Sequence, residues 1–115
     1  MNDRTLLELA ARAAGLGEVW YLDGFDTPYI GKKFQIGRPI EYTTWRPLED
    51  DGDALRLAVK LRFDISVERE IQVSWWQGES LETVTWPLGD DPCAAARYAI
   101  VRAAAEIGKS MGGGE

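Results

Sequence analysis

Cationic and aromatic side chains are interleaved between residues 31 and 46, where four cations and one acidic residue give a net charge of +3. Cations bind phosphate and a flat ring stacks on a base, which are the two contacts that a nucleotide requires. We therefore predict a small-nucleotide site, with the cations toward phosphate and Tyr42 or Trp45 toward the base. A solvated loop over the edge of the core is the alternative. The predicted ligand-binding residues are Lys32, Lys33, Arg38, Tyr42, Trp45 and Arg46.

A second charged segment, residues 64–89, has the opposite sign and a net charge of −4. Its carboxylates could imitate phosphates and occupy a host nucleic-acid-binding protein. Oligomeric state would help to separate the two hypotheses, because a nucleotide sponge commonly builds its pocket across a symmetric interface, whereas a charge mimic can act as a monomer. The partner-binding residues in this alternative are Glu68, Glu70, Glu79 and Glu82.

The chain contains no histidine, and Cys93 is its only cysteine. The commonest general base, the usual metal ligand and any disulfide within one chain are therefore missing. Asp50, Asp51 and Asp53 are spaced closely enough for a calcium-binding turn, but their spacing does not match an EF-hand, and capping of a helix explains them more simply. We predict that the protein is not an enzyme and uses no cofactor and no metal.

Length and charge set further limits on the kind of protein. The 115 residues suit one domain, which we expect over residues 1–111, with a flexible tail at 112–115. The net charge of −6 argues against direct binding to duplex DNA. No apolar run is long enough for a membrane span, and no leader pattern is visible at the N-terminus, so we expect a cytoplasmic protein.

Periodicity predicts the elements that must position these residues. Apolar residues at helical spacing indicate a first helix capped by Asp3, a second that starts at the aspartates and a third after Pro92. Alternating residues from 65 to 75 indicate a half-buried strand that Arg69 interrupts by a bulge, a tight turn or a chain reversal. The remaining predicted strands are 19–22, 34–36, 40–42 and 81–86, the last joined through a turn at 77–80.

Trp75 and Trp76 must point to opposite faces of the predicted strand, since neighbouring side chains alternate. Both can be buried if helices cover both faces of the sheet. If only one face is covered, the other tryptophan becomes a binding or dimer contact. The cover of the sheet therefore decides whether the chain presents an aromatic contact surface.

Two segments carry a family resemblance. Residues 45–61, WRPLEDDGDALRLAVKL, and residues 97–109, RYAIVRAAAEIGK, resemble the phage ABA sandwich domain proteins. The resemblance implies a sheet between helices and an origin in a phage or prophage, but no established general activity. The expected fold is thus a single-domain α+β protein, an α/β/α sandwich whose mostly antiparallel sheet is covered by about three helices.

These observations predict a phage-encoded, non-enzymatic accessory protein in the host cytoplasm. It would antagonise host defence by sequestering a small nucleotide signal in a homo-oligomer. The first alternative is an acidic inhibitor that binds a host defence protein through its predicted hairpin. The second is a structural or regulatory phage protein without a role in defence.

Overall fold

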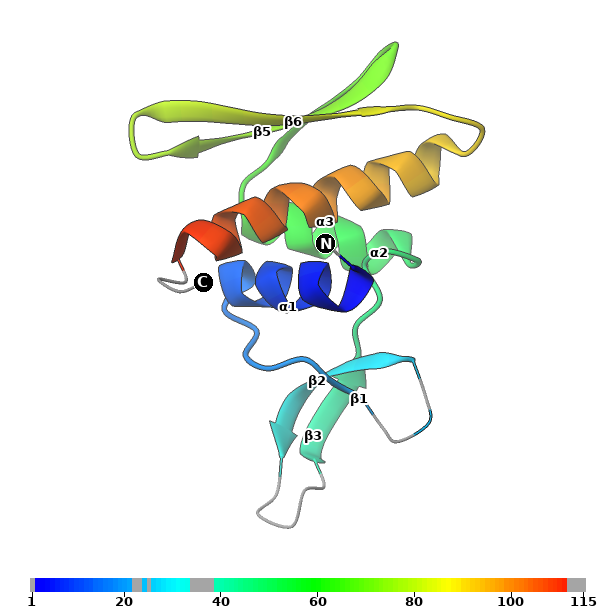
Figure 1. The fold of residues 1–115 in the computed structure, drawn as a ribbon, viewed down its shortest axis with the longest axis vertical. Helices are drawn as coiled ribbons and strands as arrows, with labels where there is room; N and C mark the ends of the chain where they lie inside the picture. Colours follow the sequence, from blue (N-terminus) through cyan, green and yellow to red (C-terminus); the bar gives the residue numbers. More distant parts are fainter. Residues whose placement is uncertain (1, 22–23, 25, 34–38, 112–115) are drawn as a thin grey trace.

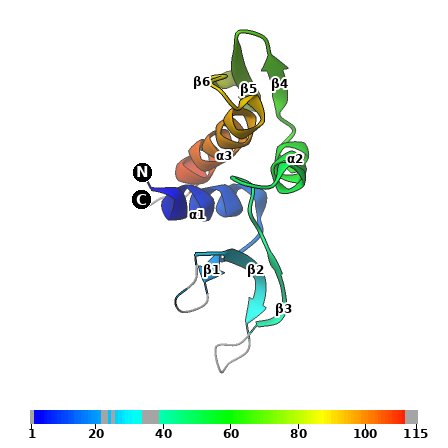
Figure 2. The same cartoon turned by 90° about the vertical axis from the view of Figure 1, so that its right-hand side faces the viewer.

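The computed structural model describes residues 2–21, 24, 26–33 and 39–111, which form three helices and two antiparallel three-stranded sheets. The expected α+β class, the three helices and the antiparallel pairing are confirmed. The layer order differs from the expected one. Figures 1 and 2 show the helices in a middle layer with one sheet on each side, so the helices separate two sheets instead of enclosing one. The predicted tail at 112–115 lies outside the described residues.

Helix α1 spans Asp3–Ala14, and its cap is Asn2 instead of the predicted Asp3. The Asn2 side chain accepts a hydrogen bond from the Thr5 amide at 2.8 Å, which satisfies one free donor of the first turn. The helix ends at Gly15, whose φ of 69° is left-handed and suits glycine. Helix α2 spans Asp51–Lys60 and helix α3 spans Pro92–Met111, as the periodicity predicted. No helix in the described part of the chain is long and apolar enough to cross a membrane.

Small residues let α1 and α3 pack closely in the centre of the molecule. Ala10, Ala11 and Ala14 of α1 and Ala104 of α3 are buried in one core cluster. At Gly108 a Cβ atom would come within 1.9 Å of the Leu9 carbonyl oxygen, so only glycine permits this approach. The helical layer is therefore held by a contact between backbones that larger side chains would prevent.

The first sheet contains β4 (Asp64–Val67), β5 (Glu70–Gln77) and β6 (Ser80–Pro87) in that order. The chain reverses between β4 and β5 at Glu68 and Arg69, which resolves the interruption seen in the sequence. One face of β5 buries Ile71, Val73 and Trp75 in the core. On the other face Trp76 remains 67% exposed, so the expectation that helices cover both faces is wrong for this sheet.

The second sheet contains β1 (Trp20–Tyr21), β2 (Pro28–Lys33) and β3 (Pro39–Thr44). Strand β1 is shorter than predicted, and β2 was not predicted at all. The ring of Trp20 stacks on that of Tyr29 at 4.9 Å, which ties the first two strands together. The strand expected at 40–42 lies within β3, whereas the one expected at 34–36 falls outside the described residues.

Candidate functional site

Of the six predicted nucleotide-binding residues, the structure describes the side chains of Trp45 and Arg46 alone. Lys32 and Lys33 belong to β2 and Tyr42 belongs to β3, with Lys32 paired to Glu41 across the sheet. Their side chains lie outside the described part, as does the whole of Arg38. Trp45 and Arg46 follow directly after β3 and are described in full.

Trp45 does not lie where a ligand would stack on it. Its backbone amide donates to the Pro28 carbonyl at 2.9 Å, and its side chain is only 5% exposed within the main core cluster. The expectation that its ring offers a free face to a base is therefore not met, because the hydrophobic effect draws this large ring into the core. Arg46 is exposed, as a phosphate contact requires.

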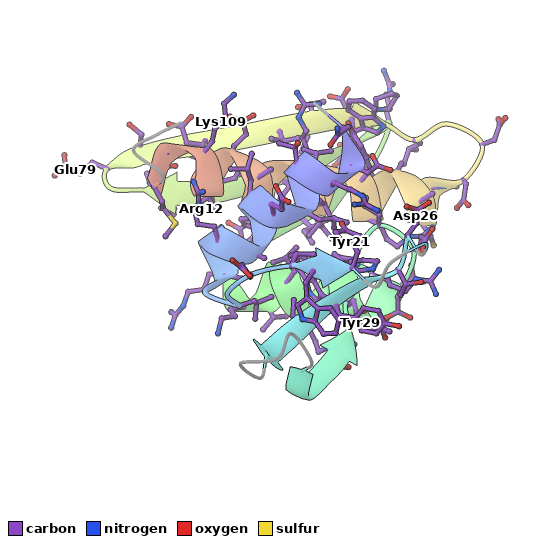
Figure 3. The ribbon with its side chains drawn as sticks, turned by 60° about the horizontal axis from the view of Figure 1, so that its bottom comes forward. Arg12, Tyr21, Asp26, Tyr29, Glu79 and Lys109 are labelled. Atoms are coloured by element: carbon purple, nitrogen blue, oxygen red, sulfur yellow. The ribbon has the colours of Figure 1, made fainter. Side chains whose placement is uncertain are left out.

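Arg46 lines a hollow of about 630 Å³ between the start of α1, β1 and the turn after β3. Arg4 and Tyr21 line the same hollow, together with the apolar side chains of Leu7 and Leu48. Figure 3 shows Tyr21 and Asp26 close together beside α1. Reasoning from the sequence missed Arg4 and Tyr21, since a lone cation in a helix and a lone ring in a strand carry no local signal.

The two arginines are positioned by carboxylates and by the tyrosine ring. The Arg4 guanidinium carbon lies 3.9 Å from the centroid of the Tyr21 ring, and its Nη2 donates to Asp26 Oδ1 at 2.9 Å. Arg46 Nε donates to Glu49 Oε1 at 2.8 Å, and its Nη2 contacts the same oxygen. A guanidinium group has five donors, so neither group is saturated by these contacts. The hollow therefore combines two guanidinium groups that retain donors with an aromatic ring.

Tyr21 carries a buried hydroxyl at this hollow. Its Oη atom has no hydrogen-bond partner among the described residues. Burial raises the pKa of this phenol above its usual value, although the nearby Arg4 acts in the opposite direction. The hydroxyl therefore stays neutral near pH 7, and because its oxygen is enclosed by the protein it is not open to a ligand in the hollow.

The aspartates at the start of α2 serve the helix and its neighbours. The Asp50 side chain accepts from the Asp53 amide at 2.8 Å, which confirms the capping interpretation. Asp51 binds Arg97 at 2.6 Å, and this hydrogen bond raises the pKa of the Arg97 guanidinium. Over the described residues, no three acidic or cysteine side chains gather closely enough to hold a metal ion.

The four glutamates of the acidic alternative are not brought together. Glu68 lies in the turn before β5 and Glu79 in the turn after it, so they occupy opposite ends of that strand. Glu82 pairs with the buried Trp75 and thus faces the helices, whereas Glu70 alternates with the buried positions and faces away. A charge mimic needs one continuous surface, and these four side chains do not form one.

No model of a known protein family, no curated protein and no solved structure matches this chain. The resemblance to the phage ABA sandwich proteins therefore stays a prediction.

Proposed function

We propose that this chain is a non-enzymatic binding protein that holds a small nucleotide in the hollow beneath α1. The observation that carries the proposal is the meeting of Arg4, Tyr21 and Arg46 on one hollow, two of them from outside the basic segment. Its volume of about 630 Å³ lies within the range of about 300 to 1,000 Å³ that small-ligand sites occupy. The mixture of cations, ring and apolar lining suits phosphate at one end and a base at the other.

The first turn of α1 adds further donors for phosphate. Asn2 and Asp3 line the hollow, and backbone amides at a helix start carry partial positive charge and lack partners within the helix. In the bound state that we propose, phosphate oxygens accept from these amides and from both guanidinium groups. The base packs against Leu7, Leu48 and the edge of Tyr21.

Carboxylates in the hollow repel an anion, so phosphate must displace or share their ion pairs with the two arginines. Asp26 and Glu49 neutralise the two guanidinium groups in the free protein, and Asp3 adds a third carboxylate to the lining. Both pairs are exposed, and exposed ion pairs contribute only about 0 to 1 kcal/mol, so phosphate can displace or share them at small cost. Neutralising Glu49 should therefore strengthen binding, whereas neutralising Arg46 should weaken it.

Thermal shift and calorimetry with ATP, cyclic di-AMP and pyrophosphate test this proposal. We expect at least one nucleotide to stabilise the wild-type protein, and Arg46→Gln or Arg4→Gln to weaken its binding about tenfold or more. Glu49→Gln should bind more tightly, and Lys109→Gln, at the far end of α3, should bind like the wild type. Equal binding by the wild type and both arginine variants would contradict the proposal.

The narrower form of the proposal is a homo-oligomeric sponge for a host defence signal, encoded by a phage. Native mass spectrometry of protein purified from cells, followed by acid release of small molecules, addresses this form. An intact nucleotide released in stoichiometric amount from an oligomer supports it. An empty monomer contradicts the sponge, and the binding assays then test nucleotide recognition alone.

A further inference from the structure

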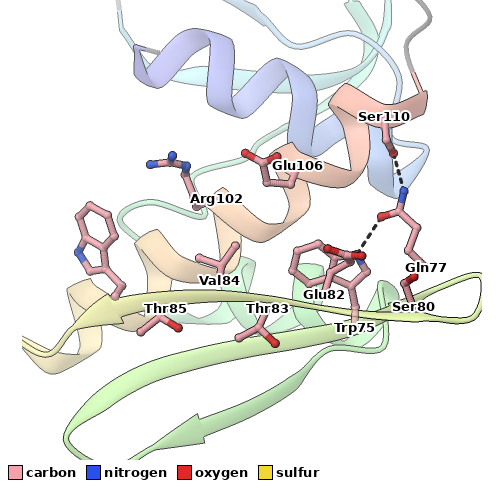
Figure 4. Close-up of a pocket in the computed structure, with 11 residues that line it drawn as sticks. Trp75, Gln77, Ser80, Glu82, Thr83, Val84, Thr85, Arg102, Glu106 and Ser110 are labelled. Atoms are coloured by element: carbon pink, nitrogen blue, oxygen red, sulfur yellow. Dashed lines mark hydrogen bonds between the residues drawn. The ribbon is translucent and has the colours of Figure 1, made fainter.

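A groove of about 650 Å³ runs between β6 and α3. It shares no lining residue with the proposed nucleotide hollow. Figure 4 shows Arg102 and Glu106 of α3 above the strand. Thr83 and Thr85 line this groove as well as Val84, although neighbouring side chains of a strand point to opposite faces. Because the groove is lined by side chains from both faces of β6, it runs along the edge of this strand, where the backbone itself is accessible.

The hairpin register determines which backbone groups of β6 reach that edge. Gly78 and Glu79 form a two-residue turn, and the Gly78 φ of 65° matches the first central position of a type II′ turn. The flanking residues Gln77 and Ser80 therefore form a hydrogen-bonded pair, and such pairs recur at every second residue. In β6 these hydrogen-bonded positions are Ser80, Glu82, Val84 and Trp86. Thr83 and Thr85 lie between them, so their backbone N–H and C=O groups point away from β5.

These outward groups are available for pairing. Strand β6 is the last strand of its sheet, and no backbone hydrogen bond joins Thr83 or Thr85 to a described residue beyond the sheet ladder. An edge with alternating donors and acceptors is the surface to which another extended chain can add. The two threonines that offer these groups are the same two that line the groove.

Side chains along the groove provide different environments. Toward the β5–β6 turn, Glu82 and Glu106 form no ion pair with any described residue. Toward the other end lie Val84 and Trp86, whose ring packs on Tyr98 at 4.5 Å. Between these ends lies Arg102 of α3, whose Nη1 donates to the Tyr98 hydroxyl at 3.4 Å. An occupant therefore meets two carboxylates toward the turn, one guanidinium group in the middle and an apolar surface at the other end.

From this combination we infer that the groove binds an extended peptide segment, which adds to β6 as a further strand. Alternate side chains of that segment face α3, with a basic residue near Glu82 and Glu106 and an apolar residue near Val84 and Trp86. Glu82 and Glu106 outnumber Arg102 among the charged side chains of the groove, so the turn end favours lysine or arginine over phosphate. This site does not depend on the proposed nucleotide hollow, because it shares none of its lining residues.

The probes are two capped synthetic peptides of about seven residues, in which threonine alternates with one lysine and two leucines. The second peptide has the reversed sequence, so that both parallel and antiparallel addition to β6 are tested. We expect saturable binding by fluorescence anisotropy of the labelled peptide. Amide hydrogen exchange of Thr83 and Thr85 should slow about tenfold or more on binding, whereas the Glu82 amide, already paired with β5, should not change. Replacing the peptide lysine by glutamate should weaken binding about tenfold.

Peptide N-methylation separates strand addition from simple side-chain contact. Methylation of one alternate set of amides should abolish binding, while methylation of the other set should leave it within about twofold, because only one set faces the protein. In the protein, Thr83→Pro removes an outward N–H that the ladder with β5 does not use, and it should weaken binding about tenfold or more. Thr83→Val keeps that N–H and should bind like the wild type.

Three results would overturn the inference. They are an absence of saturable binding by either peptide, unchanged exchange at Thr83 and Thr85 in the bound state, and equal loss of binding from both methylated sets. A fourth result is hydrogen exchange at Thr83 and Thr85 that slows as protein concentration rises without any peptide. That result would also overturn the inference and assign the β6 edge to a second copy of this chain. The methylated peptides keep the test decisive even if Thr83→Pro fails to fold.

Discussion

Tyr21 combines a cation–π contact with a buried hydroxyl group. Its ring supports the Arg4 guanidinium, its hydroxyl is buried, and that hydroxyl lacks a hydrogen-bond partner among the described residues. A buried polar group without a partner lowers stability by about 1 to 3 kcal/mol compared with a satisfied one. A buried water or a small movement of the surrounding side chains would supply the missing hydrogen bond.

The raised pKa of Tyr21 predicts a loss of stability at alkaline pH. Burial favours the neutral phenol in the folded protein, so above about pH 10 the unfolded chain ionises first. The free energy of unfolding should be unaffected by this group below that pH and should fall as pH rises toward the higher folded pKa. Tyr21→Phe should show a smaller fall than the wild type in urea unfolding at several pH values. An identical pH dependence in both proteins would contradict the prediction.

At the scale of elements, the crossing of α1 and α3 organises the middle layer. Gly108 allows the α3 backbone to approach the α1 carbonyl of Leu9, and Arg12 of α1 donates back to the Gly108 carbonyl at 3.4 Å. Contact at this point brings α1 and its hollow into a fixed relation with the helix that carries the β6 groove. The nucleotide hollow is lined by α1 and the β6 groove by α3, so this crossing connects the two helices that carry the proposed sites.

Gly108→Ala should separate these two helices. The added methyl group meets backbone, which cannot move aside as a flexible side chain can, so we expect a loss of about 1 to 3 kcal/mol in the free energy of unfolding. Gly52→Ala in α2 is the matched control, because its added methyl meets mainly the end of the Arg56 side chain. That variant should be neutral or up to about 1 kcal/mol more stable, since alanine favours helix. Equal effects in urea unfolding would show that the helix crossing does not require glycine.

At the scale of the whole molecule, the layer order leaves the outer face of β5 and β6 uncovered. Trp76 and Leu81 are directly paired across these strands and are 67% and 53% exposed. A tryptophan beside a leucine on an open sheet face is typical of a contact surface. We predict that the homo-oligomer uses this face, which would place the nucleotide hollow within one protomer and not across the interface as a sponge commonly has it.

Replacement of both residues by threonine tests that surface. Trp76→Thr with Leu81→Thr should lower the free energy of unfolding of the monomer by about 1 to 2 kcal/mol, because part of each side chain is buried and their cross-strand contact is lost. Sedimentation velocity should show that the variant is monomeric at concentrations where the wild type associates, while Gln72→Ala on the same face leaves association unchanged. A wild type that is monomeric throughout would contradict the predicted oligomer.

The sequence by itself determined the features that depend on neighbouring residues. Helical spacing in α1 to α3, alternation in β5 and the turn at Gly78 are local signals, so the α+β class and the β5–β6 hairpin were predictable. Local ambiguity explains the error at the start of α1, where Asn2 and Asp3 are both acceptable caps and only Asn2 is used.

Only the tertiary structure decided how these elements meet. Strand β2 depends on pairing with β3, and its Pro28 and Gly31 give no strand signal alone. Burial of Trp45 and exposure of Trp76 follow from which faces the helices cover. Arg4, Tyr21 and Arg46 are distant in the chain and meet only because the second sheet lies beneath α1. Periodicity reports the faces of single elements, whereas the burial of apolar surface between distant elements selects which faces come together.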